Sequence, residues 1–186
     1  GKHYLASEWN IKKFTNNRFS NIKLNENAPP KISEKKYSIL KQNFTNPKDI
    51  DQNNLLIFEN NLCFETSDFK NNKFKKIYII SNNNKNRCIK LNEKVLKFKS
   101  SLIHDQEQRF KNQSINCEII DISEIKKIEK VVGLYPTIGE NLDYLNSNAY
   151  KINFLHRELD QYSWQYCNKG FFNFKNYIPK IISIFN

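Results

Sequence analysis

The sequence predicts an α+β fold in which helices flank a central antiparallel sheet. Two observations lead to this prediction. Between residues 55 and 99, short apolar or alternating runs of strand length are separated by asparagine-rich turns, a pattern typical of an antiparallel sheet. Farther along, apolar residues recur at helical spacing in residues 121–132 and 150–169, which predicts helices packed beside the sheet.

The strand predictions come from five short runs. Apolar, β-branched and aromatic residues fill the first three, and the last two alternate between apolar and polar residues. The runs are residues 55–58, 62–64, 74–80, 87–91 and 95–99. Asn60-Asn61 and the polar stretch 81–86 supply turns between them. A short helix is also expected within residues 32–43, in an otherwise loop-like first fifty residues.

Two longer helices are expected after the sheet. Asp121 and Glu124 have the spacing of a capping box, and Gly133 suits the position just after a helix end. In the second helix, residues 150–169, a stripe at helical spacing ends before a glycine; the stripe is Leu155, Leu159, Tyr162 and Tyr166. This second helix would be an addition at the C-terminal end.

Composition limits the class of protein. The chain has 186 residues, 39% of them hydrophobic and 13% aromatic, which predicts one domain with a real core and excludes a disordered chain. No apolar run approaches the roughly 18 residues that a transmembrane helix needs. The four cysteines form no CxxC pair, so reduced thiols in an intracellular or organellar matrix compartment are expected.

The net charge of +11 favours anionic partners, nucleic acid first and a membrane surface second. A second explanation stays open. Asparagine, lysine, isoleucine and phenylalanine are all abundant and share AT-rich codons, so a base-composition bias could supply many of the lysines. The charge alone does not choose between these explanations.

Several segments appear in an order that resembles a known family. The opening Gly1-Lys2-His3-Tyr4-Leu5-Ala6 is similar to an Asp-Arg-Gly-His-Leu-Ala motif, and Ala28-Pro29 follows it at matching spacing. Residues 55–64, 73–99 and 119–135 resemble later segments of the same family, the sugar-nonspecific ββα-metal nucleases of the endonuclease G kind. The resemblance covers roughly residues 1–140. It implies a degenerate endonuclease G-like domain in residues 1–145, without the family's N-terminal strands, and a helical extension in residues 146–186.

The resemblance also implies that the catalytic positions are replaced. The general base falls on Tyr4, whose phenol has a pKa near 10 and is a poor base at neutral pH. Lys2 takes an arginine position, Ser33 the position of the metal-binding asparagine, and Lys41 an acidic position. A hydroxyl is a weak metal ligand and a cation opposes metal binding. We therefore expect no enzyme activity, no metal and no cofactor, unless a one-residue slip makes His3 the base of an active nuclease.

Lysines next to aromatic residues suggest contact with RNA. One group lies near the position of the family's metal site and a second precedes an expected strand; the lysines are Lys31, Lys35, Lys36, Lys41, Lys70, Lys73, Lys75 and Lys76. Phe69, Phe74 and Tyr78 interleave with the second group. The alternative is a solvated lysine face above an ordinary core.

The aromatic C-terminal segment suggests docking to a partner. More aromatic surface gathers there than one helix could bury on its own domain; the residues expected to dock are Trp164, Tyr166, Phe171 and Phe172. The first hypothesis is a structural or RNA-contacting subunit of a mitochondrial ribosome, with a matrix location implied by the resemblance. The alternatives are an accessory subunit of a mitochondrial respiratory complex and an active metal-dependent nuclease that uses His3.

Overall fold

A computed structural model describes residues 6–24 and 46–185 of the chain. The chain divides into two compact units, residues 1–42 and residues 43–186. Within the described ranges, no helix combines the length and the apolarity needed to cross a bilayer. The helix expected in residues 32–43 lies outside the described residues.

The described part of the first unit holds one short helix, α1 (Glu8–Phe14). The Ser7 side chain caps it by accepting a hydrogen bond from the backbone N–H of Asn10, at 3.3 Å. Trp9 and Phe14 are largely exposed, and the ammonium group of Lys13 lies 4.8 Å from the centre of the Trp9 ring. None of the residues in α1 is buried.

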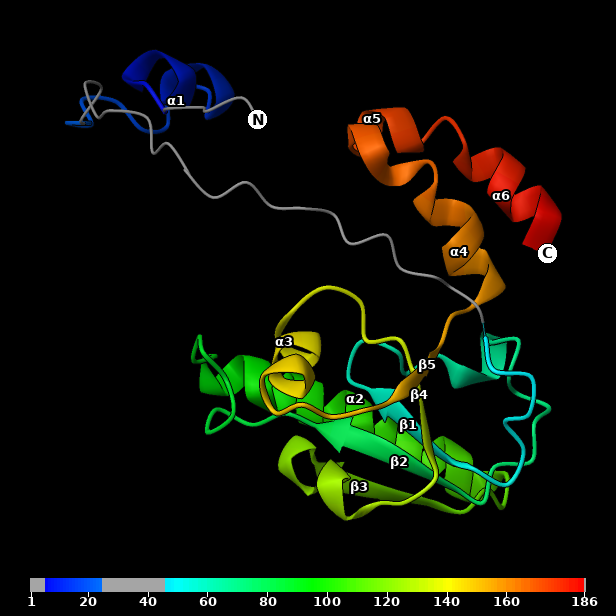
Figure 1. Cartoon of the computed structure of the whole chain (residues 1–186). Coiled ribbons are helices and arrows are strands. Elements are labelled where there is room, and N and C mark those ends of the chain that lie inside the picture. The colour runs from blue at the N-terminus through cyan, green and yellow to red at the C-terminus, as the bar shows by residue number, and fades with distance from the viewer. Residues whose placement is uncertain (1–5, 25–45, 186) are drawn as a thin grey trace. The chain divides into compact units, whose positions relative to one another are not determined.

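The second unit is built on a five-stranded sheet in which every neighbouring pair is parallel. The strands lie in the order β3-β2-β1-β4-β5. Their bounds are β1 (Asn54–Phe58), β2 (Lys76–Ser81), β3 (Cys117–Asp121), β4 (Val131–Leu134) and β5 (Asn153–Leu155). The prediction of an antiparallel sheet is therefore wrong, and the fold class is α/β rather than α+β (Figure 1).

The error arose in residues 87–99, which were expected to form two strands. They instead form a loop and the start of α2 (Glu93–Asn112), a twenty-residue helix. The alternation in residues 95–99 was misleading because Val95 and Phe98 are exposed on α2, and the buried face of the helix lies farther along, at Ile103, Gln106 and Phe110. Asn92 begins the helix by accepting a hydrogen bond from the N–H of Lys94. With this helix as the crossover, β2 and β3 must run parallel.

The other connections hold shorter helical elements. A single 3₁₀ turn, η1 (Phe64–Thr66), lies between β1 and β2, and a longer one, η2 (Ile122–Lys127), between β3 and β4. Asp121 caps η2 as its sequence predicted, but the expected helix ends early and Gly133 lies in β4. The helix α3 (Glu140–Ser147) connects β4 to β5.

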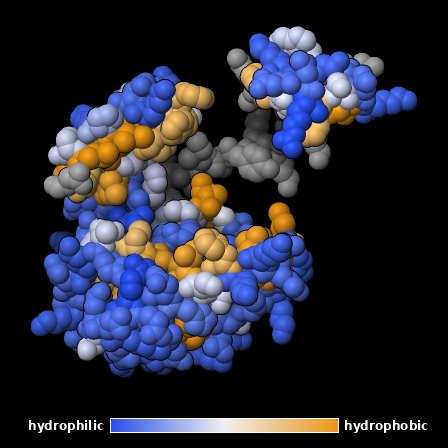
Figure 2. Space-filling model, turned by 180° about the vertical axis from the view of Figure 1, so that it is seen from behind, coloured by the Kyte–Doolittle hydropathy of each residue, from blue (hydrophilic) through white to orange (hydrophobic). Residues whose placement is uncertain are grey.

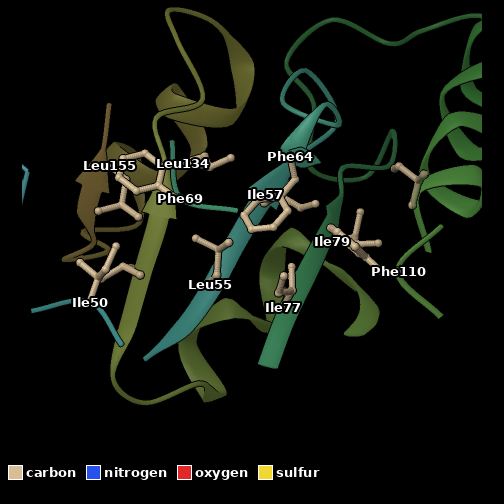
Figure 3. Packing of buried hydrophobic residues seen from close by; sticks show 12 residues of the cluster. Ile50, Leu55, Ile57, Phe64, Phe69, Ile77, Ile79, Phe110, Leu134 and Leu155 are labelled. Carbon is tan, nitrogen blue, oxygen red and sulfur yellow. The ribbon is translucent and has the colours of Figure 1, made fainter. Parts of the chain in front are cut away.

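Two hydrophobic clusters cover the two faces of the sheet. Leu55 and Ile57 point to one cluster, with Ile103 and Phe110 of α2 (Figure 3). Leu56 and Phe58 point to the other, which contains residues of η2 and α3. A strand that is buried on both faces has a continuous apolar run in its sequence. Strands of parallel sheets are usually buried in this way.

The chain continues after β5 as a set of short helices. These are α4 (Glu158–Trp164), η3 (Cys167–Lys169), α5 (Phe171–Phe174) and α6 (Ile178–Phe185). We call residues 158–185 the C-terminal extension. The prediction of one helix over residues 150–169 is wrong at its start, because residues 153–155 form β5 and Leu155 is buried in the sheet core.

Candidate functional site at the carboxyl edge of the sheet

Doubly wound parallel sheets bind ligands where the strand order reverses, outside the carboxyl ends of the strands. In this sheet the reversal lies between β1 and β4, because β2 and β3 lie on one side of β1 and β4 and β5 lie on the other. A ligand site in this fold is therefore expected at the loops that follow β1, β2 and β4.

Two asparagines join the loop after β1 to the loop after β4. The amide nitrogen of Asn60 donates to the carbonyl oxygen of Pro136 and to Oγ1 of Thr137, the latter at 3.0 Å. Asn61 is buried and donates to the carbonyl oxygen of Tyr135 at 2.8 Å. These bonds cross the strand-order reversal and hold the two loops together.

An ion-pair network fills the adjoining space. Arg87, whose side chain is only 4% exposed, lies 2.7 Å from the carboxylate of Glu59 and also pairs with Glu140 at the start of α3. Its Nε donates to the carbonyl oxygen of Asn82. Lys99 of α2 reaches the same Glu59 carboxylate at 2.7 Å. The network thus has two cations and two carboxylates, and its charges balance.

The network keeps Arg87 charged. Burial alone would lower the pKa of its guanidinium, but the hydrogen bonds and charges of Glu59 and Glu140 outweigh burial and raise that pKa above its usual value. An arginine that is fully paired and permanently protonated supplies no proton for acid–base chemistry.

Asparagines also fix the loop between β2 and α2. Asn84 bonds to both the N–H and the carbonyl of Leu91 through its side chain, each at 2.9 Å. Asn83 and Asn86 donate to the carboxylate of Asp121 at the end of β3. Burial raises the pKa of Asp121, but hydrogen bonds from Ser123, Asn86 and Asn83 outweigh it and lower that pKa overall.

Asn82 completes this edge. It is buried and its amide nitrogen donates to Oδ1 of Asn141 in α3 at 2.9 Å.

Residues 59–63 after β1 contain no glycine, and a 3₁₀ turn follows them instead of an α-helix. The glycine-rich turn and helix N-terminus that hold a pyrophosphate after the first strand of a dinucleotide-binding fold are thus both missing at that position.

The residues predicted from the nuclease resemblance cannot be placed. Lys2, His3, Tyr4, Ser33 and Lys41 lie outside the described residues. The same holds for the whole first group of predicted RNA-binding lysines, namely Lys31, Lys35, Lys36 and the same Lys41.

The second group of predicted RNA-binding lysines lies in and before β2. Lys70, Lys73 and Lys75 are exposed, whereas Lys76 is half-buried and pairs with Glu118 at 2.5 Å. Tyr78 is partly buried, and the ammonium group of Lys76 lies 5.0 Å from its ring centre, but the other two aromatic neighbours are not on the surface with the lysines. Phe69 is buried and Phe74 packs against the same core cluster, so neither ring is placed to stack on an RNA base there.

The predicted docking residues fall into two pairs. Trp164 packs inward, with its ring 5.9 Å from that of Tyr135, and Tyr166 stacks on Tyr177 of the same extension at 4.3 Å. Phe171 and Phe172 are 64% and 79% exposed. Ile182 and Ile184 of α6 are also about half exposed; the apolar run at residues 181–185 was the sequence signal that could have identified them.

His156, directly after β5, is buried. Its ring lies 4.9 Å from Tyr135 and 6.1 Å from Trp164. Burial lowers the pKa of its imidazole, and the nearby carboxylate of Asp160 offsets this only in part. His104, by contrast, is exposed on α2.

Metal-binding groups are scattered. Within residues 6–24 and 46–185, no three histidine, cysteine, aspartate or glutamate side chains gather closely enough to suggest a metal site.

Comparisons of the chain with protein-family models, with curated proteins and with solved structures find no match.

Proposed function

We propose that this chain is a non-catalytic component of a larger assembly and that its C-terminal extension docks it there. The exposed apolar surface of α5 and α6 is the observation on which the proposal depends. Phe171, Phe172, Ile182 and Ile184 are each about half exposed or more. Contiguous apolar surface of this kind marks interaction sites in proteins.

Contacts among the short helices of the extension hold that apolar surface in place. Tyr162 of α4 contacts Phe185 of α6, and Tyr166 stacks on Tyr177, so the short helices hold one another. Figure 2 shows hydrophobic residues in a stripe across this extension, at the upper left. The two sheet faces are covered by α2, η1, η2 and α3, and none of the residues of the extension except Ile181 is buried. A large aromatic such as Phe172 is a typical interface anchor.

The non-catalytic part of the proposal is supported by the carboxyl edge. There the charged groups of Glu59, Arg87, Lys99 and Glu140 pair with one another. Catalytic groups need a perturbed, available protonation state and room for a substrate. Groups tied to each other across the strand-order reversal stabilise the fold instead.

The chemistry of the chain supports the kind of partner, whereas the organelle in this proposal comes only from the nuclease resemblance, whose antiparallel sheet this chain does not have. The partner of the extension is an apolar protein surface. The net charge of +11 favours an assembly that also contains RNA. A ribosome of an organelle such as the mitochondrion is the first proposal of this kind, and a respiratory complex is the second.

Sedimentation in lysate from the native cells tests the docking proposal. We expect the full chain to migrate with a large particle and the Phe171→Ser/Phe172→Ser variant to migrate as a free protein of 22.2 kDa. Phe98→Ser is the matched control, because Phe98 is an exposed phenylalanine on α2. Ribonuclease treatment separates the ribosomal from the respiratory alternative. Migration of the unmodified chain as a free monomer would contradict the proposal.

Incubation with plasmid DNA or RNA and magnesium or manganese tests the non-catalytic part. Both substrates should remain intact. Metal-dependent cleavage that His3→Ala abolishes would instead establish the active-nuclease alternative.

A further inference from the structure

A groove of about 500 Å³ lies on the side of the sheet covered by η2 and α3. It is formed by η2, the first residue of β4, the end of α3 and the segment that leads into β5. It is therefore near the amino ends of β4 and β5, away from the ion-pair network of the carboxyl edge. Its volume lies within the roughly 300–1,000 Å³ typical of small-molecule sites.

The floor of the groove is apolar and its wall is aromatic. Ile125, Ile128, Val131 and Ile152 contribute the floor. Ile125 is buried, and the others are partly buried against the same core cluster. Such a surface accepts a flat hydrophobic ring, because burying apolar area from water is favourable.

Tyr144 and Tyr150 stack on each other at the groove, with ring centres 6.4 Å apart and planes inclined by 24°. The hydroxyl of Tyr150 donates to the carbonyl oxygen of Ser123 at 3.4 Å. Burial raises the pKa of this phenol, so it stays neutral at physiological pH and adds no negative charge. A pair of rings held in this way offers a stacking surface to a planar ligand.

Two lysines give the groove its charge. Lys126 and Lys151 both line it and both are exposed, and no carboxylate is among the lining residues. Among the described residues, no ion pair includes either lysine, whereas the adjacent Lys127 pairs with Glu124 at 3.4 Å. Two cations without a carboxylate partner favour an anionic group such as a phosphate.

Asn148 adds a directional group. Its amide nitrogen donates to the carbonyl oxygen of Tyr144 at 2.8 Å. Asn148 lines the groove, and its side-chain oxygen is the acceptor that remains. A ligand with an amino group on its ring could donate to this oxygen.

We infer that this groove binds a nucleotide, either free or as part of an RNA strand, with its base against Tyr144 and Tyr150 and its phosphate at Lys126 and Lys151. The apolar floor and stacked tyrosines match a nucleobase, the lysines match a phosphate, and the Asn148 oxygen matches an N–H donor on the base. This inference is independent of docking by the C-terminal extension.

Calorimetric titration of the full chain tests the inference with three probes. Adenosine 5′-monophosphate should bind at least tenfold more tightly than adenosine, which lacks the charge, and than inorganic phosphate, which lacks the ring. The Lys126→Gln/Lys151→Gln variant should lose most of that tenfold difference over adenosine. Lys127→Gln is the matched control, because Lys127 is an exposed neighbour that does not line the groove.

Tyr144→Ala should weaken adenosine and its monophosphate alike, and circular dichroism establishes that each variant is folded. Equal binding of the monophosphate and of inorganic phosphate would overturn the inference, as would equal losses in Lys127→Gln and in the groove variant. If a 5′-phosphorylated oligoadenylate binds more tightly than the monophosphate, the source of the nucleotide is RNA. Comparable affinities indicate a free nucleotide.

Discussion

Arg87 shows how one side chain can connect three loops of a parallel sheet. It is almost fully buried, and its guanidinium pairs with Glu59 after β1 and with Glu140 at the start of α3. It also donates to the main chain at Asn82, beyond β2. Taking a charge out of water is costly, so such a network is stable only while every member keeps its partner.

We predict that Arg87→Leu lowers the free energy of unfolding by about 3–5 kcal/mol, because the substitution leaves Glu59 with Lys99 alone and removes the partner of Glu140. Urea-induced unfolding followed by circular dichroism measures the change. Lys76→Gln is the control: it breaks the more exposed pair with Glu118, which should cost about 1 kcal/mol or less. Equal losses in the two variants would show that the Arg87 network is not a buried ionic cluster.

His156 should make the stability depend on pH. Burial lowers its pKa in the folded chain, so below the unfolded value of about 6.5 the unfolded chain binds the proton more readily. The neutral imidazole therefore contributes its full stability above that value. This contribution is lost as the pH falls from 6.5 towards the folded pKa.

We predict that the free energy of unfolding decreases between pH 7 and pH 5, and that His156→Phe reduces this decrease while an aromatic ring stays beside Tyr135 and Trp164. Urea unfolding at pH 5, 6 and 7 measures the slope. His104→Gln is the control substitution, because His104 is exposed on α2. An unchanged slope in His156→Phe would mean that another group titrates in this range.

At the scale of elements, β5 separates the core from the C-terminal extension. It pairs with β4 over three residues and contributes Leu155 to the core cluster. The backbone of His156, the next residue, is held by both side-chain atoms of Asn46, at 2.8 and 3.0 Å. The domain boundary expected after residue 145 thus falls inside α3, upstream of a strand that the sheet uses.

Two truncations should therefore behave differently. Removal of residues 158–185 should leave the parallel sheet folded, with a loss of a few kcal/mol because Trp164 no longer covers Tyr135. Removal of residues 150–185 also deletes β5 and Leu155, and loss of one core leucine alone costs about 2–5 kcal/mol, so we expect this protein to be largely unfolded. Far-ultraviolet circular dichroism and thermal unfolding compare the two. Equal stability would show that β5 is dispensable.

The sequence predicted individual elements better than their arrangement. Residues 55–58 and 74–80 were expected to be strands and correspond to β1 and β2. Residues 117–121, however, were not recognised as β3. Period-2 alternation over only five residues misassigned 95–99, since the helical pattern becomes visible only when Ile103 and Phe110 are included.

The carboxyl edge could not have been predicted from local patterns. Glu59 and Arg87 are 28 residues apart in sequence, and Arg87 and Glu140 are 53 apart. Asparagines are common in turns because of their own conformational preference, so their presence in three loops does not indicate that those loops meet. Only the parallel order of the strands brings the loops after β1, β2 and β4 to one edge, and the antiparallel prediction placed them elsewhere.

For the whole molecule, charge is the property most open to test. Residues 1–45 contain nine basic and three acidic residues, and residues 46–186 contain 21 and 16. More than half of the net charge of +11 thus belongs to the first quarter of the chain. In residues 46–185, four lysines pair with carboxylates, namely Lys76, Lys99, Lys111 and Lys127.

This distribution predicts a difference between the two lysine groups in RNA binding. Single-stranded RNA releases counterions when lysines contact its phosphates, so the logarithm of affinity falls with the logarithm of salt concentration by about 0.7 per contact. Replacing four contacting lysines by glutamine should reduce that slope by about 3. We expect this for the first group, Lys31, Lys35, Lys36 and Lys41. A smaller reduction is expected for the second group, Lys70, Lys73, Lys75 and Lys76, because Lys76 is held by Glu118.

Fluorescence anisotropy with a labelled RNA at 50–200 mM salt measures both slopes. Both sets of substitutions are made in the full-length chain, so no segment of the fold is deleted. Circular dichroism of each variant excludes unfolding as the cause of weaker binding. If neither set changes the slope, the lysines are solvated and do not contact phosphate, and AT-rich codon usage becomes the better explanation of the charge. If the second set changes the slope as much as the first, RNA competes successfully with Glu118 for Lys76, and the surface before β2 is part of the RNA contact.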